Sequence, residues 1–190
     1  MKFIKAIEAY LPVNRQEEQD KQVILNFIKE YGSQALLRDN EIAHITSSGF
    51  IMNPTFDKVL LVHHNIRNSW SWTGGHADGD EDLLRVALKE AAEETGVEDI
   101  LVLTNQIASL DILPVFGHIR KSIYVNAHLH LSAAYLLIAD ENSTVRICFD
   151  ENSGVEWFPL DRFTEEFFDQ RDVYLYGKLI SFAQNFKRQH

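Results

Sequence analysis

The sequence has little cysteine, little proline and no long apolar run, and each shortage argues against a class of protein. Cys148 is the single cysteine in 190 residues, which rules out an internal disulfide framework and suits a reducing compartment. Four prolines are too few for a proline-rich linker. No apolar run approaches the roughly 18 residues of a transmembrane helix, and no apolar segment near Met1 is typical of a signal peptide. We therefore expect a soluble cytoplasmic protein without a membrane partner.

Basic residues are also in deficit. The chain has 18 Lys and Arg against 28 Asp and Glu, a formal net charge of −10 at pH 7. Because affinity for nucleic acid comes mostly from clustered basic charge, we expect no polymeric nucleic acid as a partner. A small phosphorylated substrate remains compatible with this charge, since a bound divalent cation reverses the local sign.

What the sequence does contain suits one domain in which helices and strands interleave. Hydrophobic residues make up 45% of the chain, enough for a core that needs no disulfide. Apolar spacing predicts helices over 2–31, with an interruption at Pro12, and over 79–96 and 172–186. Strands are predicted at 42–46, 58–62, 100–103, 122–139, 145–149 and 155–158. This alternation predicts an α/β (α+β) fold, a mixed sheet covered by helices.

The segment from 74 to 97 carries most of the chemical information. It opens with a glycine-rich loop, and a helix follows for which Asp80 is the expected N-cap and Gly96 the residue after the C-terminus. Three glutamates at i, i+3 and i+4 share one face of this helix, namely Glu90, Glu93 and Glu94. Such carboxylates repel one another, and oxygen donors at this density suit Mg²⁺ or Mn²⁺. A solvated acidic face is the commoner meaning of this spacing, but the flanking glycines favour a metal site.

The same segment resembles the Nudix box, G-x5-E-x7-R-E-U-x-E-E-x-G-U, in which U is a large aliphatic residue. The matching residues are Gly75, Glu81, Glu90, Glu93, Glu94, Gly96 and Val97. Two positions depart from the pattern, because Lys89 replaces the usual arginine and Ala91 replaces a larger aliphatic residue.

The resemblance implies a Nudix fold, a mixed β-sheet sandwiched between helices, over residues 41–165 of a single domain. Residues 1–40 would be an N-terminal helical extension and 166–190 a C-terminal helix. The extension either caps the active site or forms a homodimer surface, and the sequence leaves both open. In the family, the arginine of the box pairs with its first glutamate, so Lys89 is expected to anchor Glu81, with Gly75 and Gly96 shaping the loops.

The resemblance also implies a pyrophosphohydrolase that cleaves a diphosphate linkage in a nucleoside diphosphate joined to another moiety. Glu90, Glu93 and Glu94 would hold Mg²⁺ or Mn²⁺ with help from the Gly74 carbonyl. Glu90 or Glu93 would accept the proton of the attacking water. The alternative is a non-catalytic Nudix-like nucleotide-binding or regulatory module. Such modules typically lose box glutamates, which this chain retains.

Four further residues are candidates for contact with the substrate. His128 and His130 alternate on a predicted strand, so their side chains share one side. Substrate contact, a metal pair and ordinary strand residues all suit this pair. His118 and Arg120 precede that strand in a segment suited to contact phosphate or a base, or simply to face solvent. The pattern around 70–76 and 128–131 resembles a bacterial Nudix subgroup whose substrate is undefined.

Overall fold

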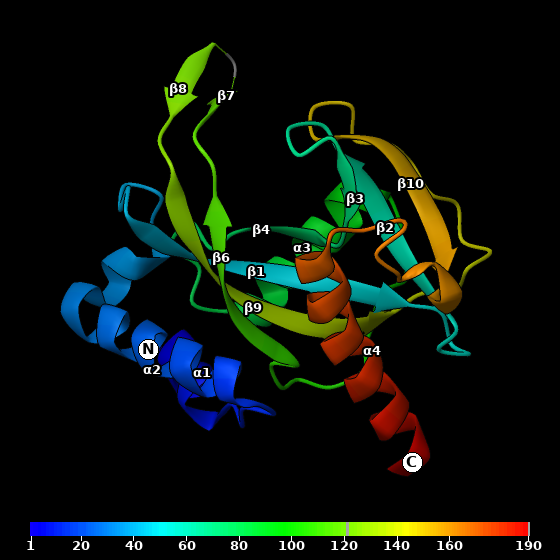
Figure 1. Cartoon of the computed structure of the whole chain (residues 1–190), viewed down its shortest axis with the longest axis horizontal. Helices are drawn as coiled ribbons and strands as arrows, with labels where there is room; N and C mark the ends of the chain where they lie inside the picture. Colours follow the sequence, from blue (N-terminus) through cyan, green and yellow to red (C-terminus); the bar gives the residue numbers. More distant parts are fainter. Residues whose placement is uncertain (121, 190) are drawn as a thin grey trace. The chain divides into compact units, whose positions relative to one another are not determined.

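The computed structural model describes residues 1–120 and 122–189 (Figure 1), which divide into two compact units. Unit 1 comprises Met1–Ser48, Gly74–Ala87 and Asn105–Tyr135, and unit 2 comprises Gly49–Thr73, Leu88–Thr104 and Leu136–His190. Three elements contribute residues to both units: β1 (Ala43–Met52), α3 (Leu83–Thr95) and β9 (His128–Ile138). The boundaries near residues 40 and 165 and the single domain stay a prediction.

Unit 1 is built on the pair β1 and β9. The backbone hydrogen bonds Leu129 N–H to Ile42 O and Ala139 N–H to Met52 O keep one constant offset, so these strands run parallel. Strand β4 (Thr73–His76) pairs with β1, and β6 (Ser109–Val115) pairs antiparallel with β9. Strands β7 (His118–Arg120) and β8 (Ile123–Val125) form a hairpin that projects beyond β6 and β9 in Figure 1. Parallel and antiparallel pairs together make the sheet mixed, as predicted.

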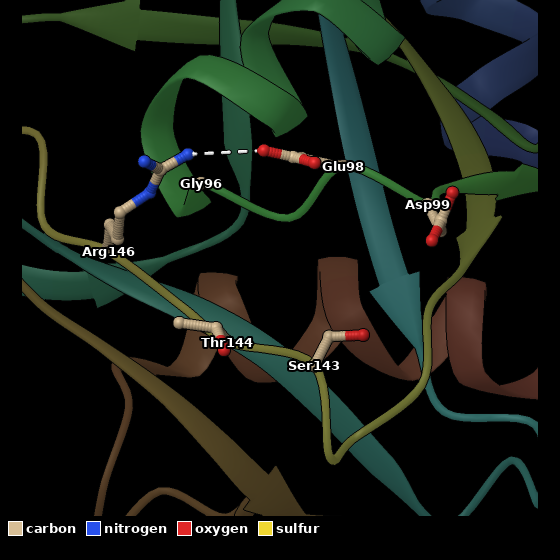
Figure 2. Close-up of a pocket in the computed structure, with 6 residues that line it drawn as sticks. All are labelled: Gly96, Glu98, Asp99, Ser143, Thr144 and Arg146. Atoms are coloured by element: carbon tan, nitrogen blue, oxygen red, sulfur yellow. Dashed lines mark ion pairs between the residues drawn. The ribbon is translucent and has the colours of Figure 1, made fainter.

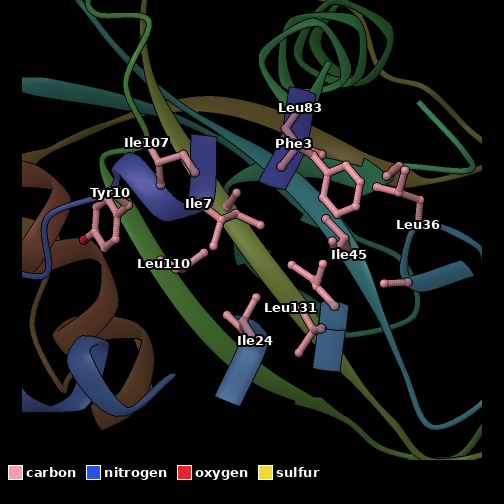
Figure 3. Close-up of a cluster of buried hydrophobic side chains, with 14 of the residues drawn as sticks. Phe3, Ile7, Tyr10, Ile24, Leu36, Ile45, Leu83, Ile107, Leu110 and Leu131 are labelled. Atoms are coloured by element: carbon pink, nitrogen blue, oxygen red, sulfur yellow. The ribbon is translucent and has the colours of Figure 1, made fainter. Parts of the chain in front are cut away.

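The predicted N-terminal helices are present and supply much of the core of unit 1. Helix α1 (Lys2–Ala9) and helix α2 (Arg15–Tyr31) flank the break at Pro12, and a short 3₁₀ helix follows at Gly32–Leu36. The apolar faces of α1 and α2 are buried against strand residues of the same unit (Figure 3). The fully buried side chains of this cluster include Phe3, Ile7, Ile24, Leu36, Ile45, Leu110 and Leu131.

Unit 2 has β2 (Lys58–His64) at its centre. Strands β3 (Ser69–Ser71) and β10 (Asn152–Pro159) both pair antiparallel with β2, and the end of β1 pairs with it through Ile51 and Leu60. The end of β9 pairs with β5 (Leu101–Val102). A 3₁₀ helix (Leu160–Arg162) leads toward α4 (Gln170–Gln189), which contributes Tyr176 to an aromatic core with Phe50, Trp72, Phe163 and Phe168. Over the described residues, no helix is both long and apolar enough to cross a membrane.

Two predictions about local structure were wrong. Residues 145–149 form no strand, because the Arg146 N–H is committed to the Thr95 carbonyl at 2.7 Å, at the end of α3. The expected N-cap Asp80 lies before the first turn, and α3 begins at Leu83. Asp82 occupies the capping position, with its carboxylate 3.3 Å from the Arg85 N–H. Asp80 instead accepts a hydrogen bond from the Asp82 N–H at 2.8 Å. Residues 80–82 therefore form a short loop between Gly79 and the first residue of α3, Leu83.

A buried carboxylate anchors helix α2 in unit 1. Glu17 is fully buried and accepts hydrogen bonds from the Tyr10 hydroxyl at 2.6 Å, the Val13 N–H at 3.0 Å and the Ser109 hydroxyl at 3.1 Å. Ser109 lies on β6, so this single side chain ties the N-terminal helices to the sheet. Burial and the adjacent Glu17 carboxylate raise the pKa of Tyr10, which stays a hydrogen-bond donor at neutral pH.

We predict that Glu17→Ala lowers the free energy of unfolding by about 2–4 kcal/mol, because it leaves the Tyr10 hydroxyl and the Val13 N–H without this acceptor. The Ser109 hydroxyl keeps a second acceptor, the Asp111 carboxylate at 2.5 Å. Urea denaturation followed by circular dichroism measures the change. Glu18→Ala, an exposed neighbour on the same helix, is the matched control and should change stability by less than about 0.5 kcal/mol. Equal effects of the two substitutions would show that the network does not hold α2 in place.

Candidate functional site

Two glycines shape the segment around α3. A Cβ on Gly74 would lie 2.5 Å from the Ser48 hydroxyl and 2.9 Å from the Ser47 carbonyl, so β4 can pack this closely on β1 only with glycine there. Gly96 has a φ of +71° and donates its N–H to the Ala92 carbonyl at 2.8 Å, which ends α3 as predicted. Gly96 therefore meets the glycine requirement of the motif in physical terms, and Gly74 precedes the first glycine of the motif, Gly75.

An acidic cluster lies in unit 2 and consists of Glu90, Glu94 and Glu151. One carboxylate oxygen of each residue lies within 4.8 Å of those of the other two. Glu94 is only 4% exposed, and its neighbours are half-buried. The side-chain amide of Asn152 donates to the Glu94 backbone carbonyl at 2.8 Å, which brings the residue before it alongside α3. The helix alone therefore supplies only part of the cluster.

Glu93 was expected in this cluster but points elsewhere. Its side chain is 55% exposed and lies 3.2 Å from the Lys89 ammonium, which also lies 3.2 Å from Glu90. In place of the expected pair between Lys89 and Glu81, Lys89 bridges two glutamates of its own helix. The Glu81 carboxylate instead accepts the backbone N–H of Lys2 at 2.6 Å. The shorter lysine chain without a guanidinium fork suits this local contact.

Electrostatics in the acidic cluster favour a cation. Burial raises the pKa of Glu90, the neighbouring Lys89 opposes that rise, and Glu93 and Glu151 add to it. Three neighbouring carboxylates, one of them almost fully buried, repel one another, and a divalent cation among them would offset this repulsion. Hard oxygen donors at this spacing fit a divalent cation such as Mg²⁺ or Mn²⁺. Sequence reasoning missed Glu151, because only two adjacent acids, Asp150 and Glu151, mark it in the sequence.

A separate group of four histidines lies in unit 1. His128 and His130 lie on one side of β9, as predicted, with their Nε2 atoms 3.2 Å apart. Two histidines that the sequence analysis did not single out join them, namely His44 on β1 and His76 on β4. The one sequence signal for His76 was its place in the glycine-rich loop. We call these four residues the histidine cluster.

His118, another predicted substrate contact, is not one of the four residues of this cluster. His118 is on β7, where its Nδ1 lies 2.9 Å from the Phe116 carbonyl. The side chain of Arg120 lies outside the described part of the chain. The assignment of His118, Arg120, His128 and His130 as substrate contacts stays a prediction.

Unit 2 also contains an open cavity of about 380 Å³ beyond the end of α3. Its lining is polar, and Arg146 faces Glu98 across it at 3.6 Å (Figure 2). The residues of the lining are Gly96, Glu98, Asp99, Ser143, Thr144 and Arg146. None of the three acidic-cluster carboxylates belongs to this lining, so the cavity is not the cation site.

Comparison with known proteins decides the family. The family model described as the NUDIX domain matches residues 43–177. The chain belongs to the Nudix hydrolase family. This family typically uses divalent metals, and membership suggests pyrophosphohydrolase activity on a small phosphorylated substrate. None of the curated proteins matches the chain significantly.

Solved structures with a similar fold include two hydrolases. A NUDIX-family hydrolase from Clostridium perfringens aligns with a TM-score of 0.52 and 18% identity, over 74% of this chain and 97% of that chain. An Ap4A hydrolase from C. elegans, solved as a binary complex, aligns with a TM-score of 0.52 and 16% identity, over 77% of this chain and 98% of that chain. At these identities the likeness establishes the fold alone.

We predict that millimolar Mg²⁺ or Mn²⁺ raises the melting temperature of this Nudix protein, because a cation bound only by the folded state stabilises it by mass action. Differential scanning calorimetry of wild type, Glu94→Gln, Glu151→Gln and Glu93→Gln measures the shift. The shift should shrink in the first two variants and persist in Glu93→Gln, whose side chain lies outside the cluster. A wild-type melt indifferent to both ions would refute the cation site.

Proposed function

We propose that this protein is a Mg²⁺- or Mn²⁺-dependent hydrolase of a diphosphate linkage in a nucleoside diphosphate joined to another moiety. The acidic cluster carries the proposal. Its three carboxylates converge on one point, its helix has the spacing of the Nudix box, and the family typically employs a divalent metal.

The proposal assigns metal binding to the residues of the acidic cluster. Glu90, Glu94 and Glu151 would hold the cation, with the Gly74 carbonyl as a further predicted ligand. When bound, the cation would neutralise the diphosphate oxygens and lower the pKa of the attacking water. Glu93 was also predicted to bind the metal. Its side chain would have to move away from the Lys89 ammonium, 3.2 Å distant, to do so.

Of the two glutamates expected to accept the proton, Glu90 is the better candidate. A general base must lie within hydrogen-bond reach of the water that it activates, and Glu90 belongs to the acidic cluster where that water would be polarised. Glu93 is more exposed and lies beside the Lys89 ammonium. Lys89 would act as a positioning residue that balances the charge of both glutamates.

A substrate screen tests the proposal. Purified protein with Mg²⁺ or Mn²⁺ is incubated with nucleoside diphosphate sugars, ADP-ribose, dinucleoside polyphosphates and nucleoside triphosphates, and the products are separated chromatographically. The dinucleoside polyphosphates are included because one solved structure with this fold is an Ap4A hydrolase. We expect one class to be cleaved at a diphosphate linkage only when a divalent cation is present. Nucleotide binding without turnover of any substrate would instead support the non-catalytic module.

We predict that Glu90→Gln lowers kcat on the substrate so found by about 10²- to 10⁴-fold, since the amide cannot accept the proton. Glu93→Gln is the matched control on the same helix and should retain most of the activity. The reverse order of these two effects would assign the proton to Glu93.

We also predict that Lys89→Arg preserves kcat and that Lys89→Met lowers it by less than Glu90→Gln does. Arginine keeps the charge beside both glutamates, whereas methionine keeps only the length of the side chain. Steady-state kinetics of the three variants gives the ranking. A loss in Lys89→Met as large as in Glu90→Gln would mean that the lysine contacts the reacting groups.

A further inference from the structure

The histidine cluster brings four imidazole rings together from three neighbouring strands of unit 1. The ring centroid of His44 lies 4.9 Å from that of His76, 4.8 Å from that of His128 and 5.2 Å from that of His130. His130 lies 4.9 Å from His76 and 5.1 Å from His128. One ring nitrogen of each residue lies within 4.8 Å of those of the other three. Strand β1 carries His44 between its neighbours β4 and β9, which carry the rest.

Backbone carbonyls determine which ring nitrogen carries the proton in two of these histidines. The Nδ1 of His44 lies 3.1 Å from the Asn40 carbonyl, and the Nδ1 of His128 lies 2.8 Å from the Asn126 carbonyl. A carbonyl oxygen only accepts, so each Nδ1 carries the proton and each Nε2 exposes a lone pair. Metal-ligating histidines characteristically donate their second ring nitrogen to a carbonyl or carboxylate in this way.

The ring nitrogens of the cluster lie close together, and one of them is left without a hydrogen-bond partner among the described residues. The Nε2 of His44 is buried and has no hydrogen-bond partner among the described residues. The Nε2 atoms of His128 and His130 face each other at 3.2 Å. Four nitrogens held about 2.0–2.1 Å from one zinc ion in a tetrahedron lie about 3.3–3.4 Å apart, close to that separation. A cation bound among these rings would give the unpartnered His44 Nε2 a partner and would hold the two facing nitrogens at about their observed separation.

Burial disfavours the protonated form of three of the four rings. Burial lowers the pKa of His76 to about 3 and that of His130 to about 2, and it also lowers the pKa of His44. A neutral imidazole is the form that binds a metal ion. Arg38 and Asp78, which act electrostatically on His44 and His76, pair with each other, so this pair adds no net charge.

We propose that the histidine cluster binds one transition-metal ion of the zinc class in a closed, four-nitrogen structural site. Imidazole donors suit Zn²⁺ and similar borderline ions, whereas Mg²⁺ prefers oxygen. A complete set of four protein ligands leaves no open position for water or substrate, which is typical of structural sites. The ion would cross-link β1, β4 and β9. This site shares no residue with the acidic cluster, and its existence does not depend on the proposed hydrolase activity.

Zinc content and cobalt spectroscopy test the proposal on the full chain. Protein purified from zinc-supplemented medium should contain one zinc per chain by elemental analysis, and the Co²⁺-substituted form should show the visible absorption of tetrahedral cobalt. His128→Gln and His130→Gln should weaken zinc binding by more than the roughly 100-fold that loss of a second-shell partner costs. His118→Gln, on β7 and outside the cluster, should leave zinc binding unchanged, as should Glu94→Gln.

Three results would overturn the proposal. The first is a wild-type protein that binds no stoichiometric zinc and whose melting temperature does not rise on zinc addition. The second is equal zinc binding by wild type and a folded His128→Gln variant, combined with a raised KM, which would make the histidine a substrate contact. The third is loss of zinc in Glu94→Gln but not in His128→Gln, which would place the ion at the acidic cluster. If a variant fails to fold, the zinc content of the wild-type protein and the change in its melting temperature on zinc addition still test the proposal.

Discussion

The way in which helix α3 ends is the constraint on which the acidic cluster depends. The last carbonyls of a helix have no partner within it. Here the Asn152 side chain donates to the Glu94 carbonyl and the Arg146 N–H donates to the Thr95 carbonyl. Asn152 is itself 1% exposed and exchanges hydrogen bonds with the backbone of Cys148. The segment 146–152 is thereby held against the helix, and Glu151 reaches Glu94 because of it.

The protein separates two kinds of metal-ligating chemistry in one sequence. The acidic cluster offers carboxylate oxygens, which hard divalent cations prefer. The histidine cluster offers neutral imidazole nitrogens, which suit borderline ions. Under the two proposals above, the first group serves the reaction and the second holds strands of unit 1 together. The two clusters would thus select different cations by the type and number of their ligand atoms, although both kinds of cation are divalent.

The helices and the Nudix motif could be predicted from the sequence, whereas the segment 145–149 and the position of Glu93 could not. The repeat of apolar residues predicted both N-terminal helices, because amphipathic spacing is a property of the chain itself. The Nudix box predicted α3, its terminal glycine and the family. Residues 145–149 were predicted to form a strand, yet the backbone N–H of Arg146 donates to the carbonyl of Thr95 at the end of α3. Glu93 was grouped with Glu90 and Glu94 by spacing, but Lys89, four residues before it, draws it to the exposed side.

The sequence by itself therefore determined what depends on neighbours within one or two helical turns: the helices, the motif, the shared face of Glu90 and Glu94, and the shared side of His128 and His130. Only the tertiary structure decided which distant residues complete each cluster. Glu151 lies 57 positions after Glu94, and His44 lies 84 positions before His128. No periodicity links such residues. Their meeting is set by strand pairing and by buried hydrogen bonds, which exist only once the chain has folded.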